Sequence, residues 1–367
     1  MNNYLPLICG ISGPEISNLE TQFIKKFNPW GVIIFERNCK SKNQLTELTG
    51  ALRAITHEHL PILIDQEGGR VSRINYMDSV VFDPARIFGE MLEKNIEIGS
   101  LALSLHSMIM ASSLREVGIN INTIPVLDIP SENESGVIGD RSYSYHKELV
   151  AKAGRIVIES LSTNGVAPVI KHIPGHGRAK VDSHFDLPIV ETSISELEEI
   201  DFYPFKENKN TDLAMTAHII YQDIDADQPA TLSKKVINDI IRKKIGFNGL
   251  IMTDDISMKA IKISAVDAAV KSLDAGCDLV LHCNSNMNEM VSIANSINKE
   301  TNLIAIPDNL IKIFKFPYLK INEMQNMYIK ESKYLPILHD STLKICSFWV
   351  HVPASRYVQK KYQIFFR

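Results

Sequence analysis

Eight short apolar runs constrain the fold of this chain more than any other feature. They lie at residues 6–11, 31–35, 61–65, 120–129, 167–173, 213–219, 249–254 and 278–283. The runs are continuous rather than alternating, which is typical of parallel strands buried on both faces. Because helix-like stretches separate most of them, the pattern predicts an α/β fold.

The stretches between the runs carry helix signals. Residues 17–28 open on Ser17, residues 41–59 hold apolar side chains at helical spacing, and residues 264–278 run from Ser264 to a stop near Gly276. Eight strand-helix units in about 300 residues match a TIM-like (β/α)8 barrel better than an open doubly wound sheet. We therefore predict one catalytic barrel over residues 1–300. Residues 301–367 form a C-terminal extension, part of which could complete the barrel.

Ionisable side chains stand where the apolar runs stop. These are Asp65, Asp128, Lys171, His172, His218, Asp254 and His282. In a (β/α)8 barrel the carboxyl ends of the strands meet at one mouth, where the active site lies. This convergence indicates an enzyme.

Composition narrows the class of protein. A net charge of -4 over 367 residues, with basic residues scattered over most of the chain, excludes the basic footprint of a nucleic-acid binder. The five cysteines are odd in number and have no C-x-x-C spacing, which favours reduced thiols. The start of the chain lacks signal-peptide features, and no apolar run is long enough to span a membrane. We expect a cytoplasmic monomer without a transmembrane segment.

The stretch "KHIPGHGRAKVDSHFDLP", residues 171–188, concentrates titratable groups between glycines and prolines. A zinc site would use His172 and His176 at i and i+4, but Pro174, Gly175 and Gly177 prevent the helical face that this spacing needs. A phosphate cradle fits less well, because no lysine, hydroxyl and helix follow in P-loop order.

A proton-carrying histidine explains more of this stretch. Asp182 precedes His184 by two positions, near enough for the carboxylate to bond one imidazole nitrogen and set the tautomer of the other. With an ordinary pKa of about 6.5, a histidine can give and take a proton at neutral pH. A metal held by loop histidines stays open as an alternative.

The residues carry a resemblance. "KHIPGHG" followed by "DSH", with "DQEGGRVSR" upstream, "GDRSYS" between and "MTDD" downstream, resembles the bacterial β-N-acetylglucosaminidase branch of glycoside hydrolase family 3 over roughly residues 5–300. The resemblance implies a TIM-like barrel that removes terminal β-linked N-acetylglucosamine with retention of configuration, without a cofactor or metal. The substrate it suggests is a peptidoglycan recycling fragment that carries anhydro-N-acetylmuramic acid.

The resemblance also assigns roles. Asp254, the first aspartate of "MTDD", would be the nucleophile, and Asp255 would belong to the following turn. His184 would be the general acid/base, with Asp182 oriented against it. The sugar-binding positions that it implies are Asp65, Arg73, Arg141, Lys171 and His172.

Two other activities remain compatible with these residues. A neutral imidazole does not repel an anionic acceptor, so phosphate could replace water and make the protein a phosphorylase. An inactive sugar-binding barrel would bind N-acetylglucosamine and release nothing. The basic, aromatic last 25 or so residues could contact an anionic membrane or a partner, or be a solvated terminus.

Overall fold

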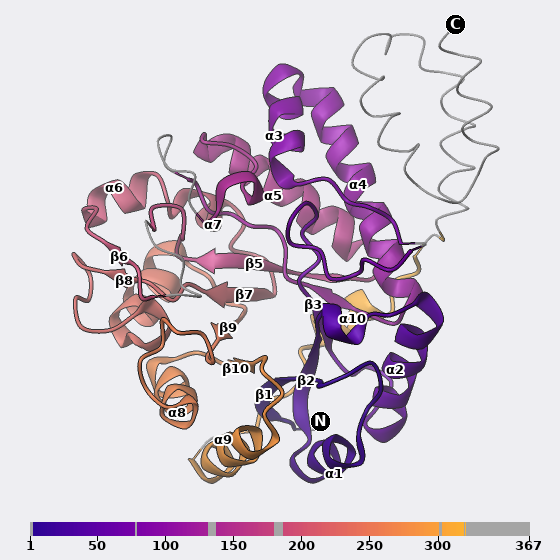
Figure 1. The fold of residues 1–367 in the computed structure, drawn as a ribbon. Coiled ribbons are helices and arrows are strands. Elements are labelled where there is room, and N and C mark those ends of the chain that lie inside the picture. The colour runs from indigo at the N-terminus through magenta and orange to yellow at the C-terminus, as the bar shows by residue number, and fades with distance from the viewer. Residues whose placement is uncertain are drawn as a thin grey trace, which may run out of the picture.

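Eight parallel strands form a closed barrel, as the sequence predicts (Figure 1). The computed structural model describes residues 3–77, 79–130, 137–179, 186–300 (backbone only at 298–300), 303–318 and 320. Around the barrel the strand order is β1-β10-β9-β7-β5-β4-β3-β2. The strands are β1 Leu5–Gly10, β2 Pro29–Ile34, β3 Ile62–Ile64, β4 Ile121–Asn122, β5 Ala167–Ile173, β7 Leu213–Thr216, β9 Leu250–Asp255 and β10 Leu279–His282. The fold is therefore a TIM-like (β/α)8 barrel.

Helices surround the strands (Figure 1). They are α1 Asn18–Phe27, α2 Lys42–Ile55, α3 Ala85–Lys94, α4 Ile96–Glu116, α5 Lys147–Ser162, α6 Ile194–Glu199, α7 Tyr203–Glu207, the π-wound η4 Lys235–Ile245, α8 Ala265–Ala275, α9 Met287–Glu300 and α10 Asp308–Phe314; three short 3-10 turns are η1 Glu36–Asn38, η2 Gly139–Arg141 and η3 Ala230–Leu232. The Ser17 side chain accepts a bond from the backbone of Glu20, and Ser264 accepts one from Asp267. Both expected caps are present.

Two features differ from the simplest sequence pattern. The apolar run at 120–129 does not form one regular strand: β4 covers Ile121–Asn122, and the chain then continues to pair with β5 through a parallel bridge between Val126 and Lys171. The N–H of Leu127 donates to the carbonyl of Lys171 at 2.7 Å. A small parallel pair outside the barrel, β6 Ile189–Val190 with β8 Ile220–Tyr221, was not predicted. Its strands are too short to leave a recognisable pattern.

The chain after α9 closes the amino end of the barrel. Tyr4 forms an antiparallel bridge with Ile304, and the Trp30 indole donates to the carbonyl of Ala305. Leu310 and Phe314 of α10 belong to the same buried cluster as the side chains that fill the barrel interior. The basic, aromatic end of the chain lies outside the described residues, and where a domain boundary falls stays a prediction.

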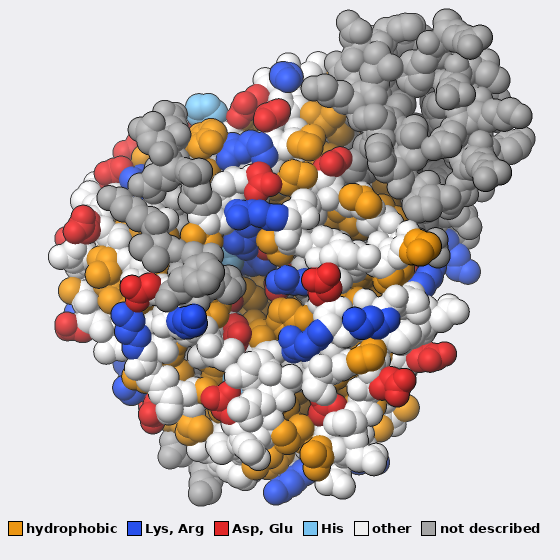
Figure 2. Space-filling model, in the orientation of Figure 1, with side chains coloured by type: hydrophobic (Ala, Val, Ile, Leu, Met, Phe, Trp, Pro, Cys, Tyr) orange, Lys and Arg blue, Asp and Glu red, His pale blue; other side chains and the backbone are white. Residues whose placement is uncertain are grey.

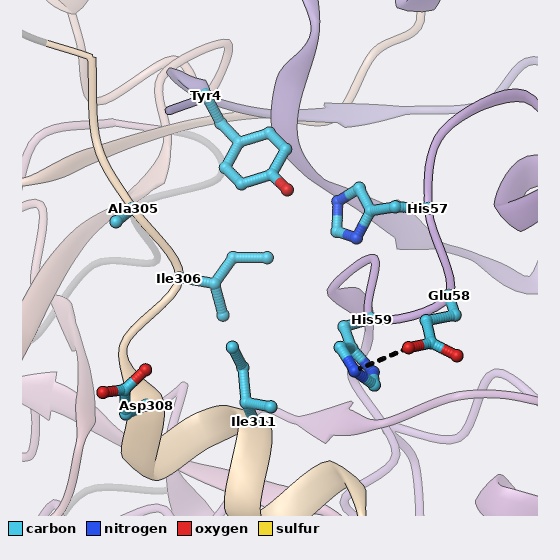
Figure 3. Close-up of a pocket in the computed structure, with 8 residues that line it drawn as sticks. All are labelled: Tyr4, His57, Glu58, His59, Ala305, Ile306, Asp308 and Ile311. Carbon is cyan, nitrogen blue, oxygen red and sulfur yellow. Dashed lines mark ion pairs between the residues drawn. The ribbon is translucent and has the colours of Figure 1, made fainter. Parts of the chain in front are cut away.

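A pocket of about 300 Å³ lies at this amino end. Figure 3 shows Tyr4 and His57 on one side of it and Ile306 and Ile311 on the other, with His59 paired to Glu58. All of its lining residues lie outside the carboxyl ends of the strands. Catalytic sites of (β/α)8 barrels lie at the opposite end, so we place the chemistry there and not in this pocket.

The described cysteines are free thiols, as expected. Cys9, Cys39, Cys277 and Cys283 are all buried, and burial raises the pKa of Cys9 and of Cys39 to about 12. Cys346 lies outside the described residues. Among the helices of the described ranges, none combines the length and the apolar character needed to cross a membrane.

Candidate active site

The carboxyl ends of the strands bring the expected polar residues together. Asp65 follows β3, Lys171 and His172 end β5, and Asp254 ends β9. Figure 2 shows lysine and arginine side chains, with acidic ones among them, gathered near the middle of one face of the molecule. His282 also ends its strand, but it pairs with Glu289 of α9 at 2.8 Å.

Asp65 is the centre of a first charged cluster. Its Oδ1 atom accepts from the Lys171 ammonium at 3.2 Å and from the Thr123 hydroxyl, and its Oδ2 lies 3.2 Å from a guanidinium nitrogen of Arg73. Burial alone would raise the pKa of Asp65, but Lys171 and Arg73 together hold it well below its ordinary value. Asp65 is therefore ionised, and its carboxylate can accept hydrogen bonds from hydroxyl groups.

Arg73 has an unused donor in this cluster. Its Nη2 faces Asp65, and its guanidinium lies over the Phe35 ring at 5.4 Å. Its Nε is buried without a hydrogen-bond partner among the described residues. A buried unsatisfied donor costs free energy, and a ligand oxygen would remove that cost.

Arg141 comes from a distant part of the chain to join the cluster. It lies at the end of η2, in the connection between β4 and α5. Its Nε and Nη2 atoms donate to the two carboxylate oxygens of Glu67, both at 2.8 Å. Glu67 also lies 2.7 Å from the Lys171 ammonium. Sequence reasoning missed Glu67, although it stands two positions after Asp65 in the quoted motif "DQEGG".

His172 is held by a buried carboxylate. Its Nδ1 lies 2.7 Å from Oδ2 of Asp128, and the other oxygen of Asp128 accepts from the backbone N–H groups of His172 and His176. Because an ionised carboxylate only accepts, Nδ1 carries the proton and Nε2 is the nitrogen left to reach a ligand. Burial would raise the pKa of Asp128, but these bonds and His172 lower it below its ordinary value.

Asp128→Asn is expected to lower Tm at about pH 7 by about 5 °C or more, because a buried charged hydrogen-bond network is broken. The folded-state pKa of Asp128 lies below its ordinary value of 3.8, so its stabilisation is present above that pH and is lost as the pH falls further. The gap in Tm between wild type and Asp128→Asn should therefore shrink on acidification. Thermal unfolding at several pH values measures this gap. A gap that stays constant down to about pH 3 would contradict the pairing.

Asp254 lies at the carboxyl end of β9 and is partly buried. Its Oδ1 accepts the backbone N–H of Asp255 at 2.8 Å. Burial would raise the pKa of Asp254, but the neighbouring His218, His172 and Lys171 lower it. The carboxylate is therefore ionised at neutral pH, as a nucleophile must be.

His218 and Asp255 lie next to Asp254 in the site. Nε2 of His218 donates to the backbone carbonyl of Asp255 at 3.0 Å. Its other ring nitrogen, Nδ1, lies 2.7 Å from the hydroxyl oxygen of Thr231. The Asp255 carboxylate instead binds the backbone N–H groups of Ser257 and Cys283, both at 3.1 Å. The two adjacent aspartates thus have different surroundings: Asp254 lies near His218, His172 and Lys171, whereas Asp255 binds the following turn.

His184 and Asp182 lie outside the described residues, so their expected roles stay predictions. The described part of the chain before them ends at Ala179, and it is held by close contacts. The Tyr221 hydroxyl donates to the Gly175 carbonyl at 2.5 Å, and a Cβ at Gly177 would lie 1.8 Å from the carbonyl oxygen of Ile129. Glycine at 177 allows this close backbone approach. Within the described ranges, no three histidine, cysteine or acidic side chains are grouped so that they could hold a metal ion.

Known proteins of similar sequence and structure show the family to which this chain belongs. A β-hexosaminidase of Nitrosomonas eutropha is 36% identical over 286 residues, which cover 76% of this chain and 80% of that protein. The structure of NagZ from Neisseria gonorrhoeae in complex with N-trifluoroacetyl-D-glucosamine has a TM-score of 0.77 and 28% identity, and the match covers 89% of this chain and 94% of that one.

Two further structures are similar. A family 3 β-N-acetylglucosaminidase from Paenibacillus sp. has a TM-score of 0.75 and 29% identity, over 89% of this chain and 61% of that one. The gonococcal protein has also been solved in complex with zinc ion, at a TM-score of 0.76, 26% identity, and coverage of 95% of this chain and 97% of that one. Residues 8–314 match the family described as glycosyl hydrolase family 3, N-terminal domain. The chain therefore belongs to glycosyl hydrolase family 3.

Proposed function

We propose that this protein is a retaining β-N-acetylglucosaminidase that removes terminal β-linked N-acetylglucosamine. One observation carries the proposal: an ionised Asp254 at the barrel mouth lies among donors suited to a sugar ring. The relatives support the substrate class, since one is named a β-hexosaminidase and one binds an N-acylated glucosamine. Family membership supports glycoside hydrolysis.

In the proposed reaction Asp254 attacks the anomeric carbon while His184 protonates the leaving oxygen. The C–O bond to the aglycone breaks, and a glycosyl-enzyme ester forms on Asp254. Water then attacks the same carbon while His184 takes its proton, and Asp254 leaves as a carboxylate. Two displacements return the β configuration. Asp182 is proposed to orient His184 and stabilise its protonated form.

The sugar is proposed to lie between the clusters at the mouth. Asp65 accepts from ring hydroxyls, and the donors of Arg73 and Arg141 bind hydroxyl or acyl oxygens. His172 offers Nε2, because Asp128 already occupies Nδ1. Lys171 keeps its three donors on protein acceptors and acts mainly through its charge.

We further propose that the substrates are peptidoglycan recycling fragments in the cytoplasm that carry anhydro-N-acetylmuramic acid. The free, buried thiols are compatible with a reducing compartment. A monomer is sufficient for the proposed reaction, since every residue assigned to it comes from one chain.

The test is hydrolysis of a chromogenic N-acetyl-β-glucosaminide, with and without phosphate and chelator, followed by identification of the sugar. We expect free N-acetylglucosamine at a rate insensitive to chelator. Sugar 1-phosphate in phosphate buffer would identify a phosphorylase instead, and loss of activity with chelator would restore the metal site. Binding of N-acetylglucosamine without any release would identify an inactive sugar-binding barrel.

A further inference from the structure

Arg141 and Lys171, two cations of the proposed sugar site, are both held by the carboxylate of Glu67. Glu67 receives two parallel bonds from Arg141 and a third contact from Lys171 at 2.7 Å. Its side chain is 5% exposed, and those of Arg141 and Lys171 are 12% and 3% exposed. Charged hydrogen bonds in such a dry setting are stronger and more directional than at the surface.

Lys171 has no spare donor in this arrangement. Its ammonium group has three protons and three acceptors: Asp65, Thr123 and Glu67. Arg141 differs, because its bonds to Glu67 use Nε and Nη2 and not Nη1, and a guanidinium has five N–H donors in all. Glu67 therefore fixes both the place of the Lys171 charge and the direction of the free end of Arg141.

The backbone that carries Glu67 is itself rigid. The N–H groups of Glu67 and Gly68 both donate to the carbonyl of Val71, which closes a tight turn. Gly68 has φ of +96°, and a Cβ there would lie 2.3 Å from the carbonyl oxygen of Asp83. The side chain of Gln66 accepts from the backbone of Arg73 and Ile74 and fixes the far side of the turn.

The negative charge of Glu67 also holds Arg141 and Lys171 in place. Asp65 and Glu67 offset part of the charge of Arg73, Arg141 and Lys171 in this cluster. If Glu67 were neutral, the two cations would repel each other and lose their shared anchor. Lys171 would then keep Asp65, and Arg141 would lose both of its charged bonds.

We propose that Glu67 is a positioning residue of the active site, which aims Arg141 at the N-acetylglucosaminyl group and holds the charge of Lys171 in place, without itself touching the sugar. This rests on the proposed function. Its effect belongs to substrate binding more than to the covalent steps, because neither cation attacks the sugar or transfers a proton in the proposed reaction.

A double-mutant cycle tests this proposal. Glu67→Gln should raise KM for a chromogenic N-acetyl-β-glucosaminide about 10-fold or more while kcat changes by less than about threefold. In an Arg141→Ala background the same Glu67 substitution should change kcat/KM by at most about threefold, because its main target is gone. If the two fold-changes simply multiply, Glu67 does not act through Arg141 and the proposal is wrong.

Controls separate this result from loss of folding or of function. Asp278→Asn removes another acid that pairs with an arginine, Arg242 at 2.6 Å, at the amino end of the barrel. It should lower Tm and leave kcat/KM unchanged. Glu67→Asp is measured in parallel because it keeps the anion and shortens its reach. Wild-type kcat/KM in both Glu67 variants would overturn the proposal, whereas an inactive wild-type enzyme would instead reject the proposed function.

Discussion

Asp254→Ala is expected to abolish turnover, with kcat falling at least about 10⁴-fold, because it removes the carboxylate on which the proposed glycosyl-enzyme forms. The barrel should stay folded. Among the described residues, the Asp254 carboxylate accepts a hydrogen bond from the backbone N–H of Asp255, so its removal disturbs little of the surrounding structure. Steady-state kinetics with a chromogenic substrate measure the loss of kcat, and a thermal unfolding curve shows whether the barrel stays folded.

The adjacent aspartate offers a matched control. Asp255→Asn removes a carboxylate from the same strand end, but one that binds the turn through Ser257 and Cys283. This variant should lose stability and keep more than about a tenth of the wild-type kcat. If Asp254→Ala retained activity and Asp255→Asn lost it, the two assignments would have to be exchanged.

His184→Ala is expected to have the second largest effect, and the effect should depend on the leaving group. For natural glycosides, kcat/KM should fall about 10²- to 10⁴-fold, because a poor leaving oxygen needs a proton from the general acid. For nitrophenyl glycosides, whose leaving groups depart as stable anions, glycosyl-enzyme formation should slow by less than about tenfold. Comparing the two substrates gives the measurement.

Asp182→Ala serves as the companion variant. If Asp182 only orients and stabilises the imidazole, this change should weaken catalysis less than His184→Ala does, with the same preference for good leaving groups. Equal losses of His184→Ala on both substrate types would argue against an acid role for His184. An Asp182→Ala enzyme with wild-type kinetics would remove Asp182 from the mechanism.

The barrel was predictable because each strand carries its own signal. A continuous apolar run ending in an ionisable residue marks Asp65, Lys171 and Asp254 as mouth residues, and the structure places all three at carboxyl ends of strands. The run over 120–129 was read as one strand, whereas regular pairing covers only Ile121–Asn122 and a bridge between Val126 and Lys171 follows. Short-range periodicity does not register this interruption. The small pair of β6 and β8 left no pattern at all.

The interactions within the site were less predictable. Asp128 was recognised as a strand-end residue, but its bonds to His172 and His176 join groups 44 and 48 positions away in sequence. Glu67 and Arg141 are 74 positions apart, and spacing alone cannot pair them. Such long-range contacts depend on how the connections fold over the mouth, which short-range patterns do not encode.

The proposed reaction is a double displacement that releases N-acetylglucosamine with its configuration retained. Proton NMR of the first minutes of hydrolysis of an N-acetyl-β-glucosaminide tests this claim most directly, because the anomeric proton of the product reports its configuration before mutarotation. We expect the β-anomer of N-acetylglucosamine to appear first. The α-anomer appearing first would contradict a glycosyl-enzyme on Asp254.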